Sequence, residues 1–195
     1  MNINILYLLF YLLLFSCNAQ PKPSVEQRLV AVDSTTLQKE YSFFHEKLFI
    51  LSTVKPYEED GRNTVSQLSL SVYSDIKKYS FPTLFQKGLI TITVAELKEK
   101  DTSLSADKLL NEIVAINENM DAFTVHYEKL TSLKNSSFSG YWTTGKLRVK
   151  GENSSNMYLN VLTNKKIIIT TVAVYDSVND LDTIHELINS IRKKN

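Results

Sequence analysis

The chain has one cysteine, three histidines, five glycines and four prolines among its 195 residues. A single cysteine, Cys17, excludes an intramolecular disulfide. The histidines, His45, His126 and His185, lie far apart and do not form the closely spaced ligand pairs typical of a zinc site, so we expect no bound metal. Glycine and proline this scarce exclude collagen-like, repeat and low-complexity chains.

Catalytic motifs are missing as well. The sequence contains no Gly-x-Ser-x-Gly elbow, and its scattered glycines cannot build a phosphate-binding loop. The acidic run at residues 58–60 could bind a cation, although we favour a solvated turn. The Asn-Ser-Ser runs that begin at Asn135 and Asn153 match a glycosylation acceptor, but we interpret them as polar loops. We therefore expect no enzymatic activity and no cofactor.

The charge is nearly balanced, with 22 Lys and Arg residues against 21 Asp and Glu residues and a net charge of +1. This balance, with 43% hydrophobic residues, is typical of a globular protein and excludes a disordered or nucleic-acid-binding chain. The residues that follow the uncharged stretch 1–16 are enough for one domain that buries roughly 70% of its unfolded surface.

The longest apolar run, residues 5–15, is too short for the ~20 residues that span a bilayer, and it fits the core of a signal peptide. It ends in Leu14-Phe15-Ser16-Cys17, which resembles the lipobox of bacterial lipoproteins. That resemblance implies a diacylated Cys17 and attachment to the cell envelope. We expect the outer membrane and its periplasmic face, because no acidic run follows the cysteine. The predicted organisation is a signal peptide at 1–16, a tether at 17–25 and a single domain at 26–195.

Two alternatives to lipidation remain open. An ordinary secretory peptide could be cut after Ala19, with Cys17 and Ala19 as the small residues of the cleavage site, which would release a soluble protein. The apolar run could also stay uncleaved as an anchor. Pro21 and Pro23 stiffen the short polar segment after the cysteine, and this segment suits lipidation and ordinary secretion equally.

Hydrophobic periodicity indicates an α+β domain with a largely antiparallel sheet flanked by helices. Asp33 or Ser34 could begin a helix that carries Leu37, Tyr41, Phe44 and Leu48. We expect residues 58–61 to form an acidic turn after Pro56, and residues 79–88 to form a loop. Strands are predicted at 48–54, 68–72, 89–95, 123–127, 141–150, 157–163 and 166–175, and helices at 105–120 and 179–193.

The two predicted helices carry narrow apolar faces. In the closing helix Asn179 is the expected N-cap, and Arg192 and Lys193 occupy the last turn, where the helix dipole favours cations. We predict that this helix packs on the sheet through Ile184, Leu187, Ile188 and Ile191. Helix 105–120 buries Leu109, Leu110, Ile113, Val114, Ile116 and Met120.

The order of elements resembles the PsbP/DcrB-like fold. The residues that carry this resemblance are the strand at 89–95, the helix at 105–120, Gly140-Tyr-Trp142 in a long hairpin, and Asn189-Ser-Ile-Arg192 at the end of the final helix. It covers residues 88–192. The resemblance implies a non-enzymatic binding or assembly role, and its motifs place no functional residue of the family.

One charge cluster could form a binding surface. Lys146, Arg148 and Lys150 alternate along a predicted strand, and Lys165 and Lys166 lie on a later turn. Together they could meet anionic lipid head groups or an acidic partner. We favour the alternative of a solvated sheet face with edge-blocking lysines.

The predicted function is a non-catalytic envelope lipoprotein that binds a protein or lipid partner. The alternative is a secreted domain that binds a small molecule or has weak enzymatic activity, with its site between the sheet and residues 105–120.

Overall fold

A computed structural model describes residues 38–61, 72–81, 89–100, 104–118, 123–149 and 154–194. The predicted signal peptide, the tether and Cys17 lie outside these residues, and so does Lys150. No helix in the described ranges is both long and apolar enough to cross a membrane.

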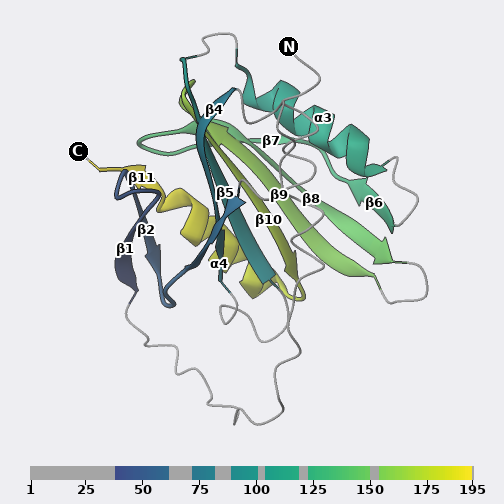
Figure 1. The fold of residues 1–195 in the computed structure, drawn as a ribbon. Coiled ribbons are helices and arrows are strands. Elements are labelled where there is room, and N and C mark those ends of the chain that lie inside the picture. Colours follow the sequence, from purple (N-terminus) through teal and green to yellow (C-terminus); the bar gives the residue numbers. More distant parts are fainter. Residues whose placement is uncertain are drawn as a thin grey trace.

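Two antiparallel sheets form the framework (Figure 1). The larger sheet has eight strands in the order β3-β4-β5-β10-β9-β8-β6, with β7 also paired to β8. The smaller sheet has the order β1-β2-β11. The strands are β1 (Lys39–Phe43), β2 (Leu48–Ser52), β3 (Tyr57–Asp60), β4 (Tyr73–Ser80), β5 (Leu89–Leu97), β6 (Phe123–Tyr127), β7 (Thr131–Lys134), β8 (Ser139–Val149), β9 (Ser155–Thr163), β10 (Ile167–Tyr175) and β11 (Arg192–Lys193).

The centre of the large sheet is buried on both faces. β10 lies between β5 and β9, and eight of its nine residues are buried. Its run of isoleucine, threonine and valine fills a pleated surface well, because β-branched side chains pack closely across strands. The predicted strands at 89–95, 123–127, 141–150, 157–163 and 166–175 are all present, and none of their ends is shifted by more than two residues.

Helix α3 (Ala106–Glu118) covers one face of the sheet, over β6, β8 and β9. Leu109, Leu110 and Ile113 are fully buried there. They pack in one cluster with Met157, Leu159 and Val161 of β9. These three residues lie where the apolar face of residues 105–120 predicted them. Val114 is partly buried, and the side chains of Ile116 and Met120 lie outside the described part of the chain.

Helix α4 (Val178–Asn189) and the small sheet cover the opposite face. Ile184, Leu187, Ile188 and Ile191 are all buried, as predicted. They share a cluster with Leu48 and Ile50 of β2 and with the inner residues of β5, β9 and β10. The domain thus has three layers, with α3 on one side of the large sheet and α4 plus the small sheet on the other.

The ends of α4 differ from the prediction. Ser177, not Asn179, is the N-cap: it accepts a bond from the backbone of Asp180, whose carboxylate bonds back to the backbone of Ser177. The helix ends at Asn189, so Arg192 and Lys193 are not in its last turn. They form β11 and pair with β2, because the chain after Ile191 reaches the open edge of the small sheet.

The helix considered from Asp33 or Ser34 is wrong for residues 38–48. Lys39–Phe43 is β1, and residues 44–47 form the turn to β2. Phe44, His45 and Glu46 all have positive φ, which is a left-handed conformation that cannot continue a right-handed helix. Burial of Phe44 and a bond from its backbone N–H to the Tyr79 hydroxyl, 2.8 Å long, hold this turn.

Three further predictions are either wrong or fall partly on residues outside the described ranges. The predicted acidic turn at 58–61 is largely the edge strand β3, which is paired to β4. In the predicted loop at 79–88, Tyr79 and Ser80 belong to β4 and Phe81 follows that strand. Residues 82–88 of this predicted loop lie outside the described residues. The strand predicted at 68–72 is also outside them, apart from Val72 in a turn. β7 was not expected.

Candidate functional site

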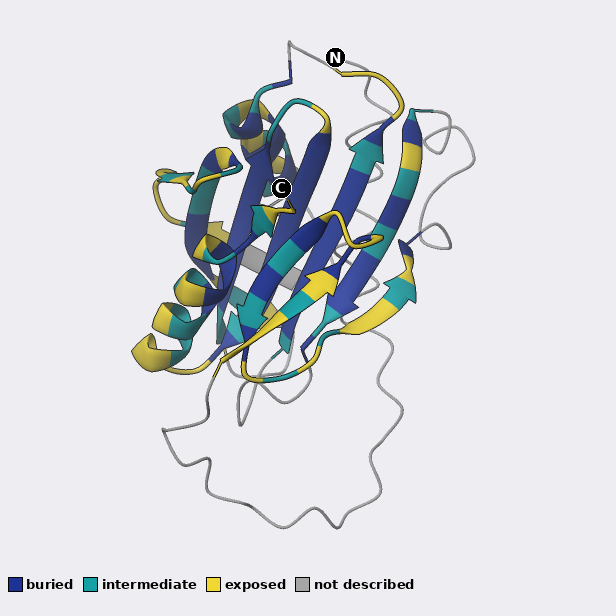
Figure 2. Cartoon of the chain, turned by 90° about the vertical axis from the view of Figure 1, so that its left-hand side faces the viewer, coloured by how far each residue is buried: buried dark blue, intermediate teal, exposed yellow. Residues whose placement is uncertain are grey.

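An open groove of about 540 Å³ lies between the edge strands of the two sheets. β1 ends the small sheet and β3 ends the large sheet, and Figure 2 shows both as largely exposed strands at the same side of the molecule. Four of the lining residues are aromatic. The full lining is Tyr41, Ser42, Phe43, Lys55, Pro56, Tyr57, Glu58 and Tyr79.

The floor of the groove is rigid. Phe43 and Tyr79 are buried and meet edge to face, with ring centroids 5.1 Å apart and an interplanar angle of 88°. The Tyr79 hydroxyl accepts the Phe44 backbone N–H. Burial, reinforced by the nearby Glu58 carboxylate, raises the pKa of Tyr79, so the phenol stays neutral. A ligand therefore meets a preformed apolar surface.

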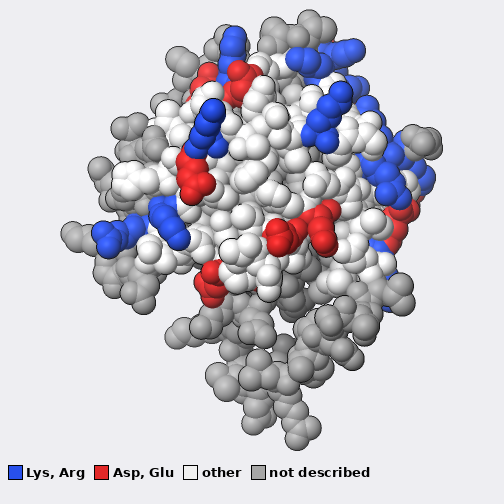
Figure 3. Space-filling model, turned by 180° about the vertical axis from the view of Figure 1, so that it is seen from behind, with Lys and Arg blue, Asp and Glu red and all other residues white. Residues whose placement is uncertain are grey.

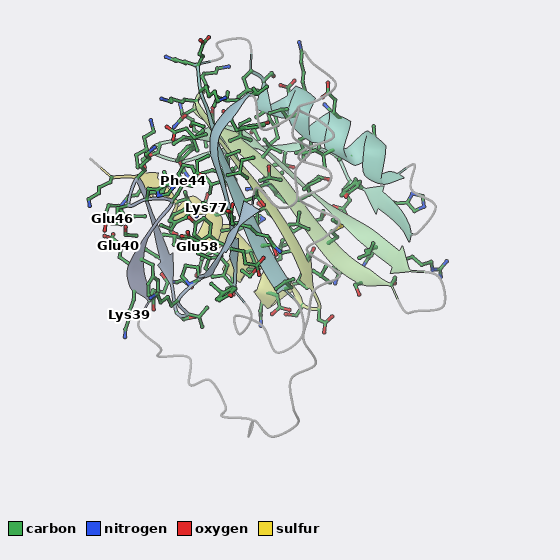
Figure 4. All side chains as sticks on the ribbon, viewed as in Figure 1. Lys39, Glu40, Phe44, Glu46, Glu58 and Lys77 are labelled. Carbon is green, nitrogen blue, oxygen red and sulfur yellow. The ribbon has the colours of Figure 1, made fainter. Side chains whose placement is uncertain are left out.

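The rim combines an exposed aromatic ring with a free cation. Tyr57 is 63% exposed, and Pro56 before it suits the first position of an edge strand. Glu58 bonds to Lys77 at 3.1 Å, and Figure 4 shows these two side chains together beside β3 and β4. Lys55 is exposed and has no carboxylate partner in the described part of the chain. The groove thus offers aromatic faces and one unneutralised ammonium.

Of these eight residues, the sequence pointed only to Glu58 as a possible ligand, within the acidic run, and it predicted no groove. They come from three segments, 41–43, 55–58 and Tyr79, which only the pairing of β3 with β4 and the packing of the small sheet bring together. The one local sign is Lys55-Pro-Tyr57, in which a lysine and an aromatic residue flank a proline.

The four described residues of the predicted basic cluster do not lie in one place. Lys146 of β8 lies opposite Asn156, whereas Lys165 follows Thr163, which pairs with Ser139 at the other end of β8. Lys146 and Arg148 are exposed at one end, and Lys165 and Lys166 lie at the other, while Lys150 is outside the described residues.

The acidic run and the histidines were also considered as ligands, and most of them bond to other side chains of the protein. Glu58 and Glu59 of the acidic run bond to Lys77 and Lys78 of β4. Within the described ranges, no group of three His, Cys, Asp or Glu side chains could hold a metal ion. His45 bonds to Asp75, and His126 is exposed on β6.

His185 of α4 packs on Trp142 of β8. The Trp142 ring stacks on Tyr158 with centroids 5.7 Å apart, and His185 meets the edge of Trp142 at 4.5 Å. Trp142 is partly buried and packs against the core cluster on that face. Burial lowers the pKa of His185, opposed in part by Asp182, so the fold favours its neutral form.

We expect His185 to make stability depend on pH. The unfolded histidine has a pKa of about 6.5, above that of the folded form, so the neutral ring's contribution is present above this pH and is lost as pH falls below it. His185→Gln should therefore show a smaller loss of stability from about pH 7 to about pH 5, measured by denaturant unfolding. The exposed His126→Gln is the control and should keep the original profile. A His185→Gln profile that matches the original would contradict the role of this ring.

The arrangement of the layers defines a fold class. An eight-stranded antiparallel sheet between two helices is a PsbP-like α+β fold, which confirms the predicted class. Among solved structures, the chain is similar to the solution structure of cyanobacterial PsbP (CyanoP) from Synechocystis sp. PCC 6803. The TM-score is 0.50 at 14% identity, over 88% of this chain and 99% of that one. No family model matches the chain, and no curated protein matches its sequence.

Proposed function

We propose that the protein is a non-catalytic binding domain of the bacterial cell envelope, held at a membrane by a lipid on Cys17. The groove between β1 and β3 is its binding site. The observation that carries this proposal is the preformed aromatic floor beneath an exposed Tyr57 and an unpaired Lys55. The accessory role implied by the PsbP/DcrB-like resemblance agrees with it.

The ligand that fits this groove is an extended segment of a protein partner. Aromatic-lined grooves take up extended peptides, whose apolar side chains pack on the rings. The Lys55 ammonium suits an acidic side chain or a terminal carboxylate on that segment, since Glu58 is already paired with Lys77. The charged residues of β3 are typical of an edge that resists strand pairing, which favours recognition through side chains.

Site-specific photo-crosslinking in the native host tests the groove. A photoreactive amino acid in place of Tyr57 should give a discrete adduct with one protein, and Lys55→Glu in the same chain should reduce that adduct about tenfold. The matched control carries the photoreactive residue at Lys108, which is exposed on α3.

Equal adducts from both positions, or none from Tyr57, would count against the groove as a binding site. If Lys55→Glu left the adduct unchanged, the groove would still be the binding site, but the proposed contact between Lys55 and a negative charge would be wrong.

The alternative site between the sheet and residues 105–120 has less support. The described side chains of α3 that face the sheet are fully buried against β9, and they are leucines and isoleucine without a convergent polar group. Binding sites for small molecules combine an apolar pocket with a few placed polar groups. The packing at α3 is that of a filled core, so we retain the groove.

The lipid anchor gives a separate prediction. Cys17→Ser should move the protein from the membrane fraction to the soluble fraction in the native host, because acylation at this position is lost. Each buried CH₂ adds about 0.8 kcal/mol, so several acyl chains bind stably where one chain is marginal. Intact mass of the wild-type protein should show the acyl groups. A soluble wild-type protein that begins at Gln20 would favour ordinary secretion.

A further inference from the structure

A second surface lies at one end of the large sheet, away from Lys146 and Arg148. Hydrogen bonds from the backbone link the segments that meet there. The Lys194 N–H donates to the Lys47 carbonyl at 2.9 Å, and the Leu97 N–H donates to the Lys166 carbonyl at 2.8 Å. The Lys193 N–H donates to the Ser137 hydroxyl at 3.0 Å, which adds the β7–β8 turn.

This end of the sheet is rich in lysine. Among the described residues at these strand ends and in the turns between them are eight lysines and four carboxylates, Glu46, Asp75, Glu96 and Glu99. Figure 3 shows Lys and Arg side chains gathered along one side of the rear face, apart from a smaller pair at the other side. We call this surface the basic pole, and its members are Lys47, Lys98, Lys100, Lys134, Lys165, Lys166, Lys193 and Lys194.

The carboxylates neutralise only part of the charge. Glu96 is shared by Lys47 at 2.5 Å and Lys166 at 3.6 Å. Burial acts to raise the pKa of Glu96, but its two lysines outweigh burial and hold that pKa below the usual value. Lys194 bonds to Glu46 at 3.3 Å. Within the described ranges, four exposed lysines have no carboxylate partner: Lys98, Lys100, Lys134 and Lys193.

We propose that the basic pole docks on the anionic head groups of a phospholipid surface. The cations lie on separate turns around the end of the sheet and do not line a groove, so they suit an extended charged surface more than a shaped partner. Lysine is a compact, hydrated charge on a flexible stem, whereas arginine is the residue suited to bidentate, shaped contacts. Attraction of this kind adds up over several lysines near an anionic bilayer and is screened by salt. It does not require the lipid on Cys17.

Sedimentation with vesicles tests this surface. The probe is the Cys17→Ser chain, purified as the host processes it, so that no acyl chain contributes. Binding to vesicles of phosphatidylglycerol and phosphatidylcholine should exceed binding to pure phosphatidylcholine about tenfold at low salt and should fall as salt rises. A variant with Glu at Lys98, Lys100, Lys134 and Lys193 should lose that excess.

The matched control changes four exposed cations elsewhere to Glu, at Lys39, Lys108, Lys129 and Arg148. It alters the net charge equally and should keep most of the binding. If the four-site pole variant does not fold, the double variant Lys98→Glu/Lys100→Glu should still weaken binding more than Lys108→Glu/Lys129→Glu. Equal losses in pole and control variants, or no preference for anionic vesicles, would overturn the proposal. Either result leaves the groove and its crosslinking test unaffected.

Discussion

Gly140→Ala is expected to destabilise the domain by more than about 3 kcal/mol, the upper part of the range for overpacked sites. A Cβ at Gly140 would lie 1.9 Å from the Val161 carbonyl oxygen and 2.9 Å from the Leu162 Cα. These are backbone atoms of the neighbouring strand β9, so no side chain can move aside. The substitution therefore has to part β8 from β9, next to the centre of the sheet.

Denaturant unfolding of the purified variant measures this loss. Ser139→Ala, on the exposed neighbouring position of β8, is the control and should stay within about 0.5 kcal/mol of the original. If Gly140→Ala were equally stable, the close approach of β8 and β9 at this position would be wrong.

Ile188→Ala is expected to lower the free energy of unfolding by about 2–5 kcal/mol. Ile188 is fully buried and lies in the cluster between α4, the small sheet and the large sheet. Removal of its side chain leaves a cavity at a place where three elements meet, so no single element can move in to fill it.

The same unfolding measurement applies to Ile188→Ala, with Asn189→Ala as its control. Asn189 is the next residue and is exposed, so its substitution should change stability by less than about 0.5 kcal/mol. A comparably small loss for Ile188→Ala would mean that α4 is not docked on the sheet.

The parts of the fold that could be predicted are those with a regular apolar pattern. The continuous β-branched run of β10 and the apolar arcs of α3 and α4 indicate their structures locally, and burial then confirms them. Residues 38–48 could not be predicted in this way. Tyr41, Phe44 and Leu48 have helical spacing, but they lie on a strand, a left-handed turn and a second strand, where Phe44 and Leu48 are buried and Tyr41 is partly buried.

The groove depends on contacts between distant segments, and that is why the sequence does not reveal it. β3 has three acidic residues among its four and no apolar alternation, and it is a strand because Glu58 and Glu59 pair with Lys77 and Lys78 of β4. Such cross-strand pairs become visible only when the register is known. The position of the basic cluster could not be predicted for the same reason. The alternation of Lys146 and Arg148 along β8 does not indicate which end of that strand lies near the turn of Lys165 and Lys166.

The pairing of β11 with β2 has a consequence for synthesis of the chain. Arg192 lies opposite Phe49, so the small sheet needs residues from near both ends of the described chain. A ribosome makes β2 long before it makes β11, and long-range pairings of this kind are slow to form. Until Arg192 and Lys193 have been made, the nascent chain lacks the strand that completes its second sheet. The small sheet can therefore be completed only after every strand of the large sheet has been synthesised.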